Sequence, residues 1–424
     1  MLKRKSFWLI SLIVLILLTG CSSNQTESEN GKAGDATKAP TEGAVAQGIT
    51  DDTIYIGHLG PQTGPAATYD LVRKGIESYF KYVNENGGVH GRQLKLVAYD
   101  DQYQPAKTVQ LARRLVEEDR VFAMLANVCT PCTAAALDYY VEKGIPLVML
   151  STGASQFVEP PIENLMGMDT FNYRIEAKIF LDYAVNELGA KKIAIAYQGD
   201  DFGREGYDAI KSVIGDYQGV EIVEEVNFLA SDSDFSSQAQ KLQESNPDVI
   251  ISYAIPSPAA NLKKAMYRIG LDDVPYIVAS VGGTDINSFS LAGEDVWNGT
   301  ITSATVPMPG QTDSESMKLY MERFSSDYPN DPIVGVNQLG WGAAQVLVEA
   351  LKRTEGDLTW DNYLQSFYTF NHWQESIFEA VSFSENNHFG LTSVFMAQAK
   401  EGSLVPISGT ITFNPETNEI QYEQ

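Results

Sequence analysis

Short apolar runs alternate with amphipathic stretches along most of this chain, and this rhythm constrains the fold more than any other feature. Predicted helices at 66–86, 104–118 and 133–143 separate the runs of the first series. These runs occupy residues 53–60, 93–101, 121–127 and 145–151. Runs this apolar, separated by helices, predict parallel strands that are covered on both faces.

The same rhythm restarts after about residue 172, with predicted helices at 203–216, 234–245 and 257–269. Its apolar runs occupy residues 191–198, 220–228, 248–255 and 275–281. The chain is longer than one hydrophobic core usually accommodates. The simplest interpretation is an α/β protein with two doubly wound, Rossmann-like lobes in tandem.

Two long helical stretches, 312–328 and 333–354, follow the second series and are interpreted as further cover for the first lobe. The chain would then cross between the lobes more than once, through a hinge of several strands. We expect one lobe in residues 52–172 plus 303–381 and the other in residues 173–302 plus 382–424.

The N-terminus has the pattern of an export signal, with basic residues at 3–5 and an apolar run at 7–18. The following "LTGC" resembles the bacterial lipobox, which implies a signal peptide in residues 1–20 and a lipid on Cys21. An ordinary signal peptide is the alternative. Residues 21–51 lack hydrophobic periodicity and are predicted to be a disordered linker. We therefore expect a lipid-anchored protein on the extracytoplasmic face of the cell membrane.

The net charge of −25 argues against two classes of partner. So acidic a surface repels nucleic-acid phosphates and anionic lipid head groups. Nucleic-acid binding and polybasic membrane binding are therefore excluded.

The "CTPC" at 129–132, between a predicted strand and a predicted helix, is the motif that most suggests chemistry. A thioredoxin-like dithiol also lies at a helix N-terminus, but near the start of a small domain. A zinc site needs two more ligands, and the four histidines show no ligand spacing with these cysteines. Ser151 and Ser155 are not in a nucleophile elbow. We therefore expect no catalytic residue, no metal, no cofactor and no enzyme.

The polar short runs share a position, because each directly follows a predicted strand. They include residues 60–70, 128–133, 151–155 and 199–208. In open α/β sheets ligands bind outside the carboxyl ends of the strands. Two lobes that face each other across a hinge would enclose a small molecule there.

Four segments, "IYIGHLGPQTGPAATYD", "NENGGVHGRQLKLVAYDDQYQP", "GIPLVMLSTGAS" and "KKIAIAYQGDDFGREGYDAIK", carry a family resemblance. They resemble the type I periplasmic binding proteins of the Leu/Ile/Val-binding kind, over residues 52–410. The resemblance implies that family's fold, a small-molecule ligand, an ABC permease as partner and a monomer.

The resemblance also implies ligand-binding positions. Thr130 would offer a hydroxyl and a backbone N–H to a ligand carboxylate, and Ser155 would offer a second hydroxyl. Aromatic walls would come from Tyr69 and Phe202. The implied set is Tyr69, Cys129, Thr130, Gly153, Ala154, Ser155 and Phe202. The alternative for the hydroxyl residues is an ordinary turn or helix cap.

Two departures from the family pattern bear on the ligand and on the thiols. The family often pairs Cys129 with a cysteine in the turn that here reads Tyr99 to Tyr103, so a disulfide to Cys132 is left open. The acid that would hold an α-ammonium is replaced by Val281 and Gly282. The resemblance therefore favours a monocarboxylate with an apolar or aromatic body over a branched-chain amino acid.

Three functions follow, in different classes. The first is a solute-binding lipoprotein of an ABC importer that binds an amino acid or an aromatic or aliphatic acid, with the "CTPC" as a turn that cradles the ligand. The second is a ligand-sensing receptor ectodomain, which would usually continue into a transmembrane helix. The third is a thiol oxidoreductase acting through Cys129 and Cys132.

Overall fold

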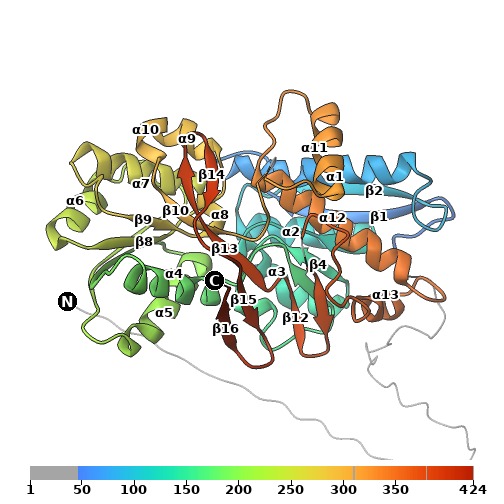
Figure 1. Cartoon of the computed structure of the whole chain (residues 1–424). Coiled ribbons are helices and arrows are strands. Elements are labelled where there is room, and N and C mark those ends of the chain that lie inside the picture. The colour runs from blue at the N-terminus through green and yellow to red at the C-terminus, as the bar shows by residue number, and fades with distance from the viewer. Residues whose placement is uncertain (1–45, 309–310, 379, 424) are drawn as a thin grey trace, which may run out of the picture. The chain divides into compact units, whose positions relative to one another are not determined.

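The computed structural model describes residues 46–308, 311–378 and 380–423 (Figure 1). The predicted signal peptide, Cys21 and most of the predicted linker lie outside these residues. Residues 46–51 belong to the folded part, because the amide of Gln47 donates to the carbonyls of Val116 and Val121, and Ile49 bridges to Ile54. The fold therefore begins before residue 52.

The first sheet is parallel, with the strand order β2-β1-β3-β4-β5. Its apolar strands are mostly buried, as runs covered on both faces should be. The strands are β1 (Thr53–Gly60), β2 (Gln93–Asp100), β3 (Ala123–Leu125), β4 (Leu147–Leu150) and β5 (Leu165–Met168). They match the first predicted series, with β5 added.

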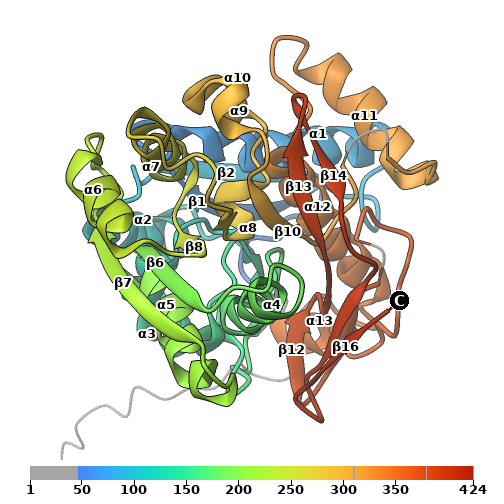
Figure 2. The same ribbon diagram turned by 60° about the vertical axis from the view of Figure 1, so that its left-hand side comes forward.

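Helices from two distant parts of the chain cover this first sheet (Figures 1 and 2). The helices from the early part are α1 (Asp70–Glu85), α2 (Pro105–Arg113) and α3 (Thr130–Lys143), with short helices at Ala67–Tyr69, Arg114–Glu118 and Ser155–Phe157. The later helices are α11 (Glu315–Asp327), α12 (Gly335–Arg353) and α13 (Trp360–Phe367).

Helix α12 crosses α1 at close range because glycines stand at the contact. A Cβ on Gly340 would lie 2.0 Å from the carbonyl oxygen of Val72, and one on Gly75 would lie 2.2 Å from that of Asn337. Helix α12 therefore packs closely against α1 of the first lobe.

The second sheet joins a parallel part to an antiparallel edge, in the order β16-β15-β13-β10-β9-β8-β6-β7. The parallel strands are β6 (Lys192–Gln198), β7 (Glu221–Phe228), β8 (Val249–Tyr253), β9 (Tyr276–Val278) and β10 (Ile301–Ala304). The antiparallel strands are β13 (Ser393–Lys400), β14 (Ser403–Pro406), β15 (Ile411–Asn414) and β16 (Glu419–Tyr422), and β14 pairs with β13.

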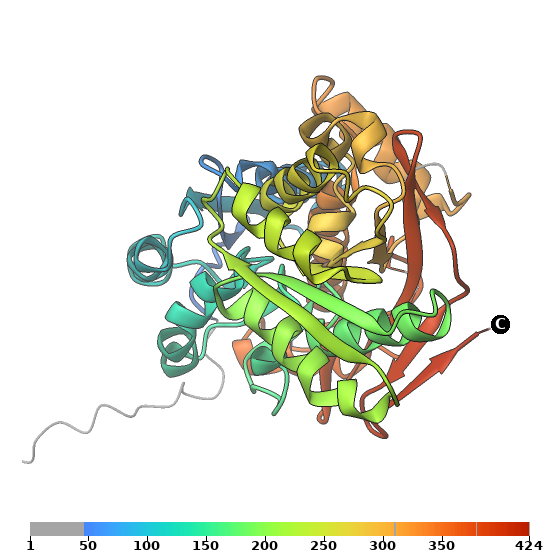
Figure 3. The ribbon, with the colours of Figure 1, turned by 90° about the vertical axis from the view of Figure 1, so that its left-hand side faces the viewer.

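Figure 3 shows helices on both sides of this second sheet, as in a doubly wound lobe. They are α4 (Tyr173–Asn186), α5 (Asp201–Val213), α6 (Ser236–Ser245), α7 (Pro256–Arg268), α8 (Ser280–Gly283), α9 (Asn287–Ala292) and α10 (Glu294–Trp297), with a short helix at Ile214–Asp216. The predicted class, two doubly wound α/β lobes, is confirmed.

The chain passes between the lobes where β5 leads to α4, where β10 is followed by α11, and where β12 leads to β13. Strands β11 (Ser382–Ser384) and β12 (Asn387–Gly390) pair only with each other and lie beside β5. The ring of Phe383 in β11 packs over Gly167 in β5, and a Cβ on Gly167 would lie 3.1 Å from that ring. This fit holds β11 and β12 beside β5. The chain then joins the second sheet at β13.

Candidate functional site

The two lobes enclose a cavity at the carboxyl ends of their parallel strands, where open α/β sheets bind ligands. It contains about 490 Å³ of empty space, including the part that is open to solvent. Lobe 1 contributes residues that follow β1, β2, β3 and β4, and lobe 2 contributes residues that follow β6, β8 and β9. The predicted residues Tyr69, Cys129, Thr130 and Phe202 line it.

The two predicted aromatic walls come from opposite lobes. Tyr69 ends the short helix before α1, and its hydroxyl donates to the carbonyl of Val281 in lobe 2 over 2.9 Å. Phe202 lies in the first turn of α5, which Asp200 caps by accepting from the N–H of Gly203. Its ring contacts that of Tyr173 edge to face, with centroids 4.9 Å apart. These walls favour an apolar body in the cavity.

The turn before α3 places Thr130 at the N-terminus of that helix. Cys129 precedes it with φ 91°, and its Sγ is bonded to that of Cys132 one helical turn later. Both cysteines are almost fully buried, which leaves their sulfurs out of reach of a dithiol partner. The Thr130 hydroxyl hydrogen-bonds that of Thr152 over 2.7 Å. The helix N-terminus and this hydroxyl together suit an anion.

The Gly153-Ala154-Ser155 turn is not part of the cavity lining. Gly153 packs so closely that a Cβ there would lie 2.0 Å from the carbonyl oxygen of Phe171. The Ser155 hydroxyl bonds the side chain of Asn172, and its N–H donates to the Glu205 carboxylate in lobe 2 over 2.8 Å. The predicted hydroxyl of Ser155 is thus paired with Asn172, and the neighbouring backbone N–H is taken by a carboxylate of the protein itself. Ser151 supplies a hydroxyl to the lining instead.

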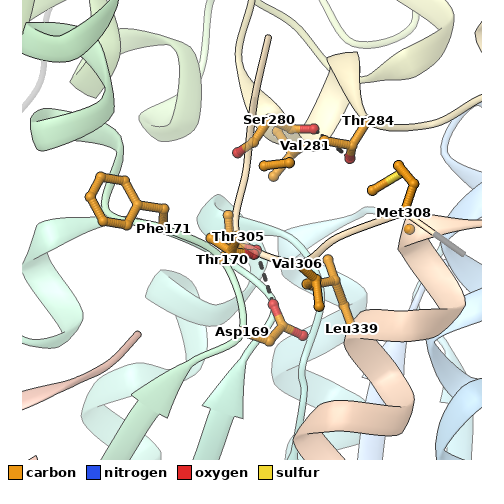
Figure 4. A pocket seen from close by; sticks show the side chains of 12 residues that line it. Asp169, Thr170, Phe171, Ser280, Val281, Thr284, Thr305, Val306, Met308 and Leu339 are labelled. Carbon is orange, nitrogen blue, oxygen red and sulfur yellow. Dashed lines mark hydrogen bonds between the residues drawn. The ribbon is translucent and has the colours of Figure 1, made fainter. Parts of the chain in front are cut away.

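Asp169 is a functional candidate that the sequence analysis missed. It follows β5 and lines a second part of the cavity, about 360 Å³ of empty space, which shares Thr170, Val281, Thr284 and Leu339 with the first part (Figure 4). Ser151 and Thr170 donate their hydroxyls to its carboxylate over 2.5 and 2.9 Å. Burial raises the pKa of Asp169 to about 7.

The cavity therefore contains a carboxylate, although the position of the family's acid is occupied by Val281. Val281 lines both parts of the cavity, so it lies where the family resemblance implies a ligand-binding residue. The acid comes from the other lobe, at the end of a four-residue apolar strand. An acidic residue directly after such a strand was the available signal, and no motif marks it.

Direct contacts join the lobes around the cavity. The Thr68 hydroxyl donates to the Asp285 carboxylate over 2.9 Å, and Tyr69 with Val281 and Ser155 with Glu205 form two further contacts between the lobes. Burial raises the pKa values of both Asp285 and Glu205. These bonds hold the lobes in a closed arrangement.

Residues 53–403 match the family model described as periplasmic binding protein. The chain belongs to this family. The match confirms the family that the sequence resemblance indicated. Its relatives are solute-binding proteins rather than enzymes, which confirms the predicted absence of catalysis. Family membership also implies a small-molecule ligand and an extracytoplasmic location.

This periplasmic binding protein is 27% identical over 51% of its length to an amino acid binding protein of Pseudomonas aeruginosa, of which the match spans 58%. A fatty acid ABC transporter substrate-binding protein from Thermomonospora curvata superimposes with TM-score 0.80 at 20% identity, over 89% and 96% of the two chains. A branched-chain amino acid ABC transporter protein from Thermus thermophilus, with bound valine, gives 0.78 at 21%, over 87% and 98%. These two structures support the fold alone.

Two kinds of feature are absent from the described residues. Within 46–308, 311–378 and 380–423, no helix has the length and apolar character to cross a bilayer. In the same part of the chain, no cluster of three or more histidine, cysteine or acidic side chains has a metal-binding arrangement.

Proposed function

We propose that this protein is the solute-binding lipoprotein of an ABC importer of the branched-chain-amino-acid type. The observation that carries the proposal is the cavity between the lobes, in which Tyr69 and Thr130 of lobe 1 face Phe202 of lobe 2. A solute that touches both lobes stabilises their closed arrangement, and the permease can recognise that arrangement.

The ligand we propose is a small carboxylate-bearing solute, either an amino acid or an aromatic or aliphatic acid. The N-terminus of α3 and the Thr130 hydroxyl support a carboxylate subsite, and a charge-assisted hydrogen bond contributes roughly 1.5–3 kcal/mol. Tyr69, Phe202 and Ile255 support an apolar body. Names of similar proteins point to amino acids and to fatty acids, which share this chemistry.

A ligand panel tests this proposal. We expect branched-chain and aromatic amino acids, 3-phenylpropionate and 4-methylpentanoate to include at least one compound that raises the melting temperature. The same compound should bind in isothermal titration calorimetry with one site per chain. If no carboxylate-bearing compound stabilises the protein, the proposed ligand class is wrong.

The lipid anchor and the permease belong to the same proposal. The lipobox-like "LTGC" supports a lipid on Cys21. Wild-type protein should fractionate with membranes in the producing bacterium, and Cys21→Ala should release it or leave its signal peptide uncleaved. Wild-type protein with an unmodified, soluble N-terminus would contradict the anchor without bearing on the ligand.

A further inference from the structure

Asp169 is a buried carboxylate that lines the cavity, and in the described part of the chain no cationic side chain contacts it. Its side chain is fully buried, and its only hydrogen-bond partners there are the hydroxyls of Ser151 and Thr170. An ionised carboxylate in such a place is costly unless a charge of opposite sign pairs with it. The protein's described residues do not supply that charge.

Ser280 lies across the cavity from Asp169, at the start of α8 in lobe 2 (Figure 4). Its side-chain oxygen is buried and has no hydrogen-bond partner among the described residues. Its backbone N–H is already used, because it donates to the Glu176 carboxylate over 2.9 Å. Buried hydroxyls normally form hydrogen bonds, so this one is a second group in the cavity wall that can bind a polar group of a ligand.

The rest of this part of the cavity is mainly apolar, with Val306 and Leu339 near Asp169 and Met308 farther away on the side of Thr284 (Figure 4). Apolar walls lower the local dielectric constant and strengthen the attraction of a carboxylate for a cation. Glu176, behind Ser280, adds a second buried carboxylate that no cation contacts in the described residues. The surroundings therefore favour a positive group and disfavour a second anion.

We propose that Asp169 and Ser280 form a subsite for an ammonium group of the solute, in which Asp169 accepts a charge-assisted hydrogen bond and Ser280 a second one. This inference rests on the proposed function, because it places the solute in the same cavity. It selects amine-bearing solutes within the proposed ligand class and puts the selecting acid on lobe 1 instead of at Val281.

Matched probes test the subsite separately from the carboxylate. The first set is phenylalanine, 3-phenylpropionate, which lacks the amine, and phenethylamine, which lacks the carboxylate. The second set is leucine, 4-methylpentanoate and isopentylamine. Calorimetry on the wild type, Asp169→Asn and Ser280→Ala gives the affinity of each probe. Asp248→Asn, an exposed acid on lobe 2 that accepts from the backbone of Lys191 and Lys192, controls for net charge.

We expect the wild type to bind the amine-bearing member of a set at least tenfold more tightly than its des-amino partner. Asp169→Asn should remove that preference, Ser280→Ala should reduce it several-fold, and Asp248→Asn should preserve it. Because Ser280→Ala removes a single side-chain oxygen, it tests the subsite even if Asp169→Asn does not fold.

The outcomes separate the two proposals. Equal or tighter binding of the des-amino acids overturns the ammonium subsite and supports the carboxylate ligand. Binding of the amines without their carboxylate-bearing counterparts supports the subsite and contradicts the carboxylate. Failure of every probe to bind contradicts both.

Discussion

Cys129 shows how the turn at the cavity is fixed residue by residue. A φ of 91° is rare for a residue with a side chain and costs of order 1–3 kcal/mol. The bond to Cys132 and the hydrogen bond from the N–H of Cys132 to Cys129 Sγ constrain this conformation. The consequence is that Thr130 starts a helix while it faces the cavity. The "CTPC" thus acts as a rigid turn in lobe 1.

The two hydroxyls predicted for a ligand carboxylate should differ in their effects. Thr130→Val keeps the shape of the side chain but removes the hydroxyl at the N-terminus of α3, so it should weaken binding of a carboxylate probe about tenfold, or roughly 1.4 kcal/mol. Ser155→Ala should change the affinity less than twofold, because Ser155 lies outside the lining. Calorimetry with the tightest acid of the panel measures both. Equal losses of affinity in the two variants would show that Ser155 also binds the ligand.

Asp169 should make stability depend on pH. Its pKa is about 7 in the folded protein against 3.8 for an unperturbed aspartate, so the folded state holds a proton that the unfolded state releases between these values. Stability from this group is therefore lost as pH rises from about 4 to 7.

Asp169→Asn removes that dependence. In the absence of ligand, the variant should gain roughly 1–3 kcal/mol relative to the wild type at pH 8, and little at pH 4. Urea unfolding at the two pH values measures the difference, and a difference of the same size at both would contradict the role of Asp169. Glu176, whose pKa burial also raises to about 7, should leave a similar but smaller trend in the variant.

At the scale of elements, the local sequence pattern predicted most strands and helices but not how distant segments pack together. The apolar runs predicted the strands of both sheets up to β9 except β5, and α7 begins within one residue of its predicted start. Helix α3 begins at Thr130 rather than 133, because Pro131 occupies its first turn, where a missing N–H costs nothing. The place of β11 and β12 beside β5 depends on a fit between Phe383 and Gly167, which are far apart in sequence.

The residues of the candidate site also fall into a group that could be predicted from the sequence and a group that could not. The family resemblance in the sequence indicated Tyr69, Thr130 and Phe202, and all three line the cavity. The loss of Ser155 to Glu205 and the entry of Asp169 depend on which lobe faces which, and that information is absent from any single segment.

The contact between α1 and α12 gives a test at this scale. Gly340→Ala places a Cβ 2.0 Å from a backbone oxygen, which cannot move aside easily, so the variant should lose roughly 2–4 kcal/mol of unfolding free energy. Gly215→Ala is the matched control, because nothing lies within 4 Å of its Cβ, and its effect should stay within about 1 kcal/mol. Chemical unfolding compares them. Equal stabilities would contradict the close helix crossing.

At the scale of the whole folded part, we expect the proposed function to depend on the balance between closed and open lobes. Polar contacts that join the closed lobes include Thr68 with Asp285 and Ser155 with Glu205. Each ligand contact that bridges the lobes adds to that balance, so affinity and closure are linked. Weakening a lobe-to-lobe bond should therefore lower the affinity for every solute by the same factor.

Glu205→Ala tests this linkage, because it removes the bond to the Ser155 N–H without touching the cavity lining. The unliganded variant should have a larger radius of gyration in small-angle scattering than the unliganded wild type, and saturating ligand should make the two alike. Its affinity should fall about three- to tenfold for amine-bearing and des-amino probes equally, in contrast to Asp169→Asn, which distinguishes them. Arg204→Ala, next to it on α5, is the control and should leave both quantities unchanged. A variant with wild-type scattering and wild-type affinity would show that the Glu205 bond does not contribute to closure.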